Sequence, residues 1–529
     1  MSQLFAKKPL HVLLEELHGE NRLRRILGPV QLTSLGVGCI IGTGIFVLTG
    51  AAAHDKSGPA LILSFALSGL ACIFAALCYA EFASLIPVAG SAYTYAYATL
   101  GELFAWIIGW DLVLEYGVAS ATVAHGWSQY FQNLLSIWHV GLPDALRNAP
   151  FDFDPVSGAL VGTGKICDLV AILIAGVITA ILVKGIRESA TFNAAMVITK
   201  VIIVIFVIVV GSFYINPENW KPFAPYGYTG MSFFGKTIMG MKGAGGEPLG
   251  MMAGAAVIFF AYIGFDSVST HAEEARNPRR DVPIGIIASL LICTVLYGAV
   301  AAVLTGMVKY NQLDIDAPVA KAFEQVGLKW AQGIIAVGAI TGITSVLLVL
   351  MLSQPRVLLA MARDKLLPPS FFGDIHPRFR TPWKSTMLTG CFVAMMAALL
   401  PLRVLAELVN IGTLLAFTIV CAAVLIMRKT HPDAERPFRA PLVPFVPIMG
   451  ILLCVLLMFS LPWQNWLRLG VWLAIGMVVY FGYGRYHSSM RHYVAKPESR
   501  PAPLPVGALA LEADPPDPQE EEAPAAPGR

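Results

Sequence analysis

Long apolar runs alternate with short polar segments along almost the whole chain. A helix of about 20 apolar residues crosses a bilayer, and twelve such runs can be drawn here. Their pattern predicts an all-α polytopic membrane protein with twelve membrane-spanning helices. The predicted spans lie near residues 31–53, 60–87, 93–134, 168–186, 190–214, 250–271, 284–308, 331–361, 384–401, 405–427, 442–461 and 466–484.

Composition supports the same class of protein. Hydrophobic residues make up 56% of the chain and charged residues 13%, whereas soluble domains carry about 25% charged residues. A net charge of +3 gives no reason to expect a nucleic acid partner. The eight cysteines show no CxxC spacing, so we expect no disulfide framework and no metal site, and we expect no cofactor.

Basic residues set the expected orientation. Twelve spans place both termini on one side, and most of the 37 Lys and Arg residues fall in cytoplasmic segments if the N-terminus lies inside. The positive-inside rule then predicts cytoplasmic N- and C-termini. We expect a cytoplasmic segment at 1–28, a transmembrane domain at 29–486 and a cytoplasmic tail at 487–529. From about residue 497 the tail is rich in Pro, Ala and Glu and is predicted to be disordered.

Glycines interrupt the first span. Residues 35–50 read LGVGCIIGTGIFVLTG. Glycine lowers helix stability, and unwound backbone inside a bilayer persists only where it is packed in protein or lines a polar cavity. The freed N–H and C=O groups therefore predict a site for a small ligand that carries a carboxylate and an ammonium.

The sixth span is interrupted as well. It reads AAVIFFAYIGFDSVSTHAEEARNP over residues 255–278, with Gly264 and Asp266 near mid-membrane. Interruptions at matching places in two halves of a chain are typical of inverted-repeat transporters with a midplane site. The alternative is a pair of GxxxG-like packing helices. That alternative accounts for Gly38 and Gly42, but not for Asp266 or for the five-span spacing.

Three separated motifs resemble one family. They are GTGIFVLTG in the first span, FFAYIGFDSVSTHAEEARNPRRDVPIGI around the sixth and SQPRVLLAMARDKLLPP after the eighth. Together they are similar to the amino acid–polyamine–organocation superfamily, in its cationic amino acid transporter branch and that branch's bacterial homologues. The resemblance implies a LeuT-like fold in which helices 1 and 6 are broken. A five-plus-five inverted repeat would cover about 29–215 and 250–428, followed by two peripheral helices at about 441–485.

The ends of the broken helices indicate which groups hold the substrate. A new half-helix begins near Thr43, Gly44 and Ile45, and its positive end suits the substrate α-carboxylate. Unwound carbonyls are expected to accept hydrogen bonds from the substrate ammonium. These carbonyls belong to Ile40 and Ile41 in the first span and to Phe260, Ala261 and Ile263 in the sixth. The resemblance implies the same assignment of N–H groups to the carboxylate and of carbonyls to the ammonium. Phe260 is also a candidate lid over the substrate site.

Two carboxylates lie in the third span. Asp111 and Glu115 are four residues apart and share one helix face, and intramembrane carboxylates are functional candidates. In the bacterial homologues the glutamate that matches Glu115 lies close to the substrate side chain, so Glu115 could pair with a cationic head group. The alternative is a structural role in helix packing, and we expect His125 to be a packing or loop-facing residue rather than a proton carrier.

Span eight bears on substrate size. Family members that prefer cationic substrates have small or polar residues facing the site here, whereas this chain places the bulky Ile343 near that position. This difference favours small neutral amino acids such as alanine over arginine.

A single lysine, Lys200, lies in the apolar fifth span. A bare ammonium in hydrocarbon costs at least about 2.5–3.5 kcal/mol, so it needs acceptors. The resemblance implies that Lys200 occupies the place where sodium-coupled relatives bind Na⁺, in contact with carbonyls of the first break and with a span-eight hydroxyl, Ser345. Lys200 is either a proton carrier, because burial disfavours a charged amine, or a permanently charged structural group.

These observations predict a secondary active permease for amino acids and not an enzyme. We expect it to work by proton-coupled alternating access and to lie in a bacterial plasma membrane. No HExxH, GxSxG, Walker A or Rossmann pattern is present. A cationic amino acid transporter or exchanger and a non-transporting amino acid sensor remain open. Expected partners are the amino acid, protons, membrane lipids and a small accessory subunit, for which Cys167 is a candidate disulfide partner.

Overall fold

The computed structural model describes residues 3–9, 27–86, 88, 90–154, 159–185, 189–233, 236–379 and 381–491. Most of the N-terminal segment at 1–28 lies outside these ranges. The tail predicted to be disordered from about residue 497 lies wholly outside them.

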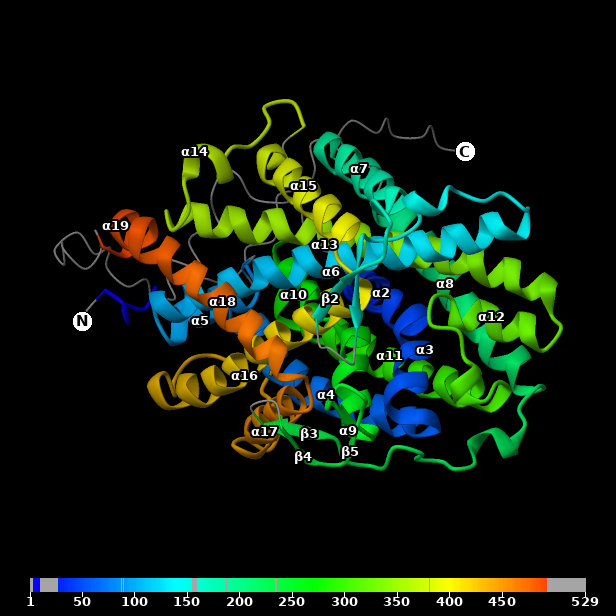
Figure 1. The fold of residues 1–529 in the computed structure, drawn as a ribbon. Coiled ribbons are helices and arrows are strands. Elements are labelled where there is room, and N and C mark those ends of the chain that lie inside the picture. Colours follow the sequence, from blue (N-terminus) through cyan, green and yellow to red (C-terminus); the bar gives the residue numbers. More distant parts are fainter. Residues whose placement is uncertain are drawn as a thin grey trace, which may run out of the picture.

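Helices form most of the described structure (Figure 1). Eight helical segments in the described ranges are long and apolar enough to span a membrane, and three shorter apolar helices accompany them. Each predicted span coincides with a helix or with an interrupted set of helices. The helices are α2 (Pro29–Ile40), α3 (Thr49–Ala52), α4 (Leu61–Leu85), α5 (Ala92–Thr99), α6 (Glu102–Ile137), α7 (Leu169–Lys184), α8 (Ser189–Ser212), α9 (Met251–Ile258), α10 (Ser267–Thr270), α11 (Pro278–Met307), α12 (Pro318–Gln325), α13 (Lys329–Arg363), α14 (Pro369–Phe372), α15 (Trp383–Leu399), α16 (Leu402–Thr430), α17 (Phe445–Phe459), α18 (Trp463–Val479) and α19 (Arg485–His487).

The predicted third span is two helices rather than one. The chain breaks between α5 and α6 at Gly101, whose φ of 104° is a conformation that other residues rarely adopt. A Cβ at Gly101 would lie 2.7 Å from the backbone carbon of Phe5. The break therefore makes room for the N-terminal segment, a contact that sequence periodicity cannot reveal.

The all-α prediction needs one addition, because the long loops contain short antiparallel hairpins. Strand β1 (Phe151–Asp154) pairs with β2 (Ala159–Gly162), with Phe151 opposite Gly162. Strand β3 (Met231–Phe233) pairs with β4 (Lys236–Met239), and β5 (Met241–Lys242) pairs with β6 (Pro248–Leu249). All three hairpins lie in segments between predicted spans.

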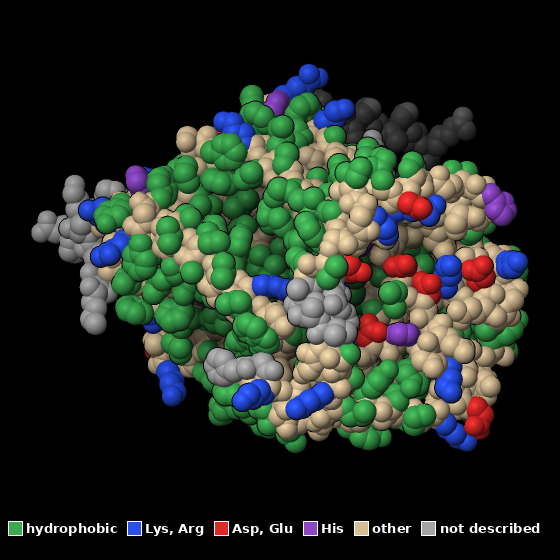
Figure 2. Space-filling model, viewed as in Figure 1, with side chains coloured by type: hydrophobic (Ala, Val, Ile, Leu, Met, Phe, Trp, Pro, Cys, Tyr) green, Lys and Arg blue, Asp and Glu red, His purple; other side chains and the backbone are tan. Residues whose placement is uncertain are grey.

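The long helices α6 and α13 run through the molecule side by side (Figure 1). The N-terminus, α5 and α19 lie at one end, and α3 and α12 lie at the other. Figure 2 shows apolar side chains over the left and centre of this face, while acidic side chains gather towards the end that carries α12. The two ends of the bundle therefore differ in charge.

The first described residues form a strap across the end of the bundle that carries the N-terminus. The backbone N–H of Lys8 donates to the Tyr97 carbonyl at 3.1 Å, and the Leu103 N–H donates to the Leu4 carbonyl at 2.9 Å. The buried Lys8 ammonium lies 2.8 Å from Asp364 Oδ1 at the end of α13. The strap thus connects α5, α6 and α13.

Candidate functional site

The first span is broken at Ile41 and Gly42. Helix α2 ends at Ile40, Ile41 is extended with ψ of 101°, and a helical run restarts with a π-helical turn at Gly44–Leu48. The Phe46 N–H is the first to regain an acceptor, the Gly42 carbonyl at 3.2 Å. The N–H groups of the preceding residues therefore lie at a helix start, where no acceptor exists within the helix.

The sixth span is broken over residues 259–266. Helix α9 tightens into a 3₁₀ turn at Phe259–Tyr262, and Ile263 is extended with ψ of 135°. Gly264 has φ of 116° before α10 begins. Asn410 of α16 supports this break, because its Nδ2 donates to the carbonyls of Ala256 at 2.8 Å and Val257 at 3.0 Å.

Glycines bring the two breaks into direct contact. A Cβ at Gly44 would lie 2.3 Å from Ala261 Cα, and a Cβ at Gly264 would lie 2.6 Å from Cys39 Sγ. Each break thus supplies one glycine that lets the other approach. Close packing at Gly44 and Gly264 therefore occurs together with the unwinding of both helices.

A cavity of about 10 Å³ lies between the breaks, and this volume holds about one water molecule. Of the predicted substrate residues, Ile40, Thr43, Gly44, Phe260 and Ile263 line it. The hydroxyl of Thr43 is buried and has no hydrogen-bond partner in the described part of the chain. Sequence reasoning missed the other lining residues, which are Cys39, Gly42, Ala119, Val123, Val346 and Leu350.

Several predicted residues lie beside the cavity but do not line it. Ile41, Ile45 and Ala261 are buried within the two breaks. Ile343 is also buried and absent from the lining, whereas Val346, three residues later, lines the cavity. Of these two residues of α13, Val346 is therefore the one that faces the cavity in this structure.

Lys200 is buried and connects three elements. Its ammonium donates to the Gly38 carbonyl, to the Ile41 carbonyl at 3.0 Å and to Ser345 Oγ at 2.8 Å. The Ser345 hydroxyl in turn lies 3.2 Å from the Gly38 carbonyl. The structure thus places Lys200 of α8 on the first break and on α13, in the arrangement expected from the resemblance.

The carbonyls of the first break already have partners. Tyr297 Oη donates to the Ile40 carbonyl at 2.7 Å, and Lys200 donates to that of Ile41. In the sixth span, the carbonyls of Ala261 and Ile263 accept no hydrogen bond among the described residues. An incoming ammonium would find its freest acceptors there.

The third-span carboxylates lie apart from the cavity. Asp111 and Glu115 are both 1% exposed, and none of their carboxylate oxygens has a hydrogen-bond partner in the described ranges. Ala119, one turn beyond Glu115, and Val123, one turn further, are the residues of α6 that line the cavity. The next residue after Glu115, Tyr116, donates to Asp266 Oδ2 at 2.5 Å and so connects α6 to the second break.

His125 has a partner that the sequence did not suggest. Its Nδ1 lies 3.2 Å from Asp168 Oδ2, and both side chains are buried. Asp168 also caps α7 by accepting a hydrogen bond from the Ala171 N–H at 3.0 Å. This contact is consistent with the packing role expected for His125.

Comparison with known proteins identifies the family. The family model described as amino acid permease matches residues 27–481. The chain is 48% identical over 488 residues to the methylthioribose transporter of Bacillus subtilis, a match that covers 92% of this chain and 99% of the relative. It is 46% identical over 488 residues to the branched-chain amino acid permease BcaP of the same species, with the same coverage. It is also 40% identical over 435 residues to the vacuolar cationic amino acid transporter 4 of Arabidopsis thaliana, covering 82% of this chain and 68% of the relative. The chain therefore belongs to the amino acid permease family of the amino acid–polyamine–organocation superfamily, among the bacterial homologues of the cationic amino acid transporters.

Proposed function

We propose that this protein is a secondary active permease that carries small neutral amino acids, such as alanine, by proton-coupled alternating access. The observation that supports it best is the facing pair of helix breaks, which pack against each other at Gly44 and Gly264 and both line one cavity. Such paired breaks are the usual site of substrate binding in inverted-repeat transporters.

We assign the substrate groups as follows. The α-carboxylate is held by the N–H groups of Thr43, Gly44 and Ile45, at a helix start that favours anions. The ammonium is held by the carbonyls of Ala261 and Ile263, while those of Phe260, Ile40 and Ile41 are shared with protein donors. Because the cavity has room for about one water, the side chain of Phe260 must move when an amino acid enters.

The wall of the cavity favours a neutral side chain. Ala119, Val123, Val346 and Leu350 supply apolar surface, and the lining has no charged residue in the described part of the chain. Glu115 is buried and does not line the cavity, so a cationic head group in the cavity would not meet its carboxylate without a rearrangement of the site. Branched-chain amino acids are the second candidate substrate, because Val346 and Leu350 match apolar side chains and a 46% identical relative is a branched-chain amino acid permease.

The proposed layout has twelve spans, with five-helix repeats at about 29–215 and 250–428, peripheral helices at about 441–485 and both termini in the cytoplasm. The Lys and Arg residues in the segments between the predicted spans support this orientation by the positive-inside rule. We place Lys200 and Ser345 as the coupling pair, because Lys200 joins the first break to α13.

Uptake by proteoliposomes tests the function. Labelled alanine should accumulate under an inward proton gradient, and replacing Na⁺ with K⁺ should change nothing. Competition by the twenty amino acids and by methylthioribose would rank the substrates. Binding without uptake or exchange under any gradient would favour the sensor, and strict sodium dependence would reject proton coupling.

A further inference from the structure

A groove of about 660 Å³ lies away from the proposed substrate site, between the start of α11 and the loop that follows α16. We call it the interface groove. Its lining includes Arg279, Arg280, Ile284, Ala288, Leu291 and Phe438. Its volume falls within the range of about 300–1,000 Å³ typical of small-molecule sites.

The groove is lined by two arginines, Arg279 and Arg280, and by one glutamate, Glu435. Arg279 Nη1 lies 3.9 Å from Glu435 Oε2, and both side chains are partly exposed, so this pair is weak. Arg280 is exposed, and its side chain has no hydrogen bond or ion pair with any described residue. Two guanidinium groups are therefore available to an anion at this end of α11.

The floor of the groove continues along the outer face of the helix. Ile284, Ala288, Leu291 and Val295 repeat at helical spacing. Val295 is 73% exposed and Leu291 47%. In a membrane-spanning helix these exposed apolar side chains meet lipid, so the groove opens into the acyl region as well as towards its two arginines.

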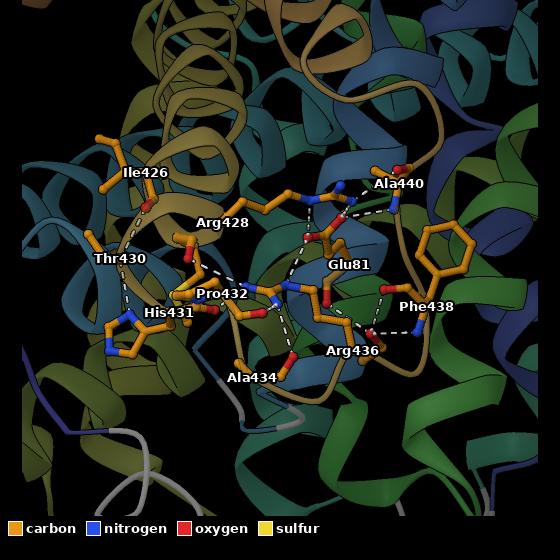
Figure 3. A network of polar contacts seen from close by, with 12 residues as sticks. Glu81, Ile426, Arg428, Thr430, His431, Pro432, Ala434, Arg436, Phe438 and Ala440 are labelled. Atoms are coloured by element: carbon orange, nitrogen blue, oxygen red, sulfur yellow. Dashed lines mark hydrogen bonds and ion pairs between the residues drawn. The ribbon is translucent and has the colours of Figure 1, made fainter.

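The opposite wall is held in place by buried charges. Figure 3 shows Arg428 and Arg436 converging on the carboxylate of Glu81. Arg428 donates to Glu81 at 2.7 and 3.0 Å, and Arg436 lies 3.4 Å away. The Ala440 N–H donates to Glu81 at 2.8 Å, and the Phe438 N–H donates to Ser84 Oγ at 3.3 Å.

This network fixes the loop that carries Phe438 against α4. Its own arginines are occupied by Glu81 and by loop carbonyls, since Arg436 donates to those of His431 at 2.6 Å and Ala434 at 2.9 Å. The groove therefore has an ordered wall and an apolar floor, and Arg279 and Arg280 are the basic residues among the described residues that line it.

We propose that the interface groove binds an anionic phospholipid of the cytoplasmic leaflet. Its phosphate would contact Arg279 and Arg280, and an acyl chain would lie along Ile284, Ala288 and Leu291. Basic pockets between transmembrane segments on the cytoplasmic side recognise such head groups. The groove lies at that end in the proposed orientation, because Leu27, just before α2, forms a bridge with Ala275, just before α11.

Purified full-length protein in detergent tests the proposal. Dioleoyl phosphatidylglycerol should raise the unfolding temperature and stay bound in native mass spectrometry, whereas dioleoyl phosphatidylcholine should do neither. Each arginine near a membrane surface contributes about 1 kcal/mol, or roughly five-fold in affinity. The double variant Arg279→Gln/Arg280→Gln should therefore lose most of the phosphatidylglycerol effect.

Two further variants distinguish lipid binding in the groove from a general effect of positive surface charge. Ala288→Trp should fill the floor and remove lipid retention with both arginines intact. The control Arg363→Gln/Lys429→Gln removes the same charge from exposed sites outside the groove and should behave as wild type. Equal effects of the two lipids, an equal loss in the control, or the same stabilisation by inorganic phosphate alone would overturn the proposal. If the double arginine variant is unstable without lipid, Arg280→Gln alone gives the same test, because the Arg280 side chain has no hydrogen bond or ion pair with any described residue.

Discussion

Gly44 and Ala261 are packed so closely that no side chain fits between them, since a Cβ at Gly44 would lie 2.3 Å from Ala261 Cα. The conflict is with backbone, which cannot rotate away as a long side chain can. The breaks of the first and sixth spans therefore lie at the same level and in direct backbone contact at the proposed substrate site. Glycine at position 44 is needed for contact between helices, in addition to any contact with a ligand.

Gly44→Ala should sharply reduce uptake. Overpacking of this kind costs about 1–3 kcal/mol, and relief requires the breaks to separate and the cavity to change shape. We expect at least about ten-fold slower alanine uptake, with a lower unfolding temperature. Gly298→Ala is the control, because a Cβ there meets nothing within 4 Å. Normal uptake by Gly44→Ala would show that the contact between the breaks is not required.

Lys200→Met should uncouple transport from the proton gradient. The variant removes the donor to Gly38, Ile41 and Ser345, and each buried acceptor left unpaired costs about 1–3 kcal/mol. Substrate-induced thermal stabilisation should persist, while concentrative uptake and its response to pH should be lost. Lys184→Met, at the exposed end of α7, should leave both unchanged. A wild-type pH response in Lys200→Met would move proton coupling to another group, with Glu115 and Asp111 the next to test.

Val346→Ala should enlarge the cavity and change substrate preference. Val346 lines the cavity, and one methylene in a hydrophobic pocket changes discrimination about 10-fold or more. Uptake of leucine relative to alanine should rise by about that factor in a competition assay. An unchanged ratio would contradict the assigned role of span eight.

Ile343→Ala should affect stability instead. Ile343 is buried and does not line the cavity, so truncation removes packing at a cost of about 2–5 kcal/mol. We expect a lower unfolding temperature and an unchanged ratio of leucine to alanine uptake. A changed ratio would mean that Ile343 limits side-chain size after all.

Lys8→Met should weaken the strap at the end of the bundle. Lys8 pairs with Asp364, which also accepts a hydrogen bond from Tyr93 Oη at 2.6 Å. Breaking one side of a buried pair costs about 3–5 kcal/mol, so the unfolding temperature should fall clearly. Lys7→Met is a matched control, because the neighbouring lysine is exposed. Equal stability of the two variants would show that the pair is not important.

The sequence predicted features that depend on local chemistry. Glycines and Asp266 marked the breaks, and the isolation of Lys200 in an apolar helix required acceptors, which the structure supplies. Contacts between distant segments were not predictable in this way. Nothing near Gly101 indicates that Phe5 will pack on it.

The sequence could not predict the rotation of a helix about its axis, nor ion pairs between residues far apart in the chain. Val346 and Ile343 are both apolar residues of one helix, and only the rotation of α13 decides which one lines the cavity. Glu81 and Arg428 are 347 positions apart. Nothing in the local sequence of either residue specifies that the two should meet.

The bridge between Leu27 and Ala275 has a mechanical consequence. The Leu27 N–H donates to the Glu274 carbonyl at 2.9 Å, and the Arg276 N–H donates to the Leu27 carbonyl at 2.8 Å. The same two spans also touch at Gly44 and Ala261, so they are fastened to each other at two levels. Neither can swing alone without breaking one set of contacts. The first and sixth spans should therefore move together as one rigid unit during the transport cycle. The unwound segments are the places where this unit can bend.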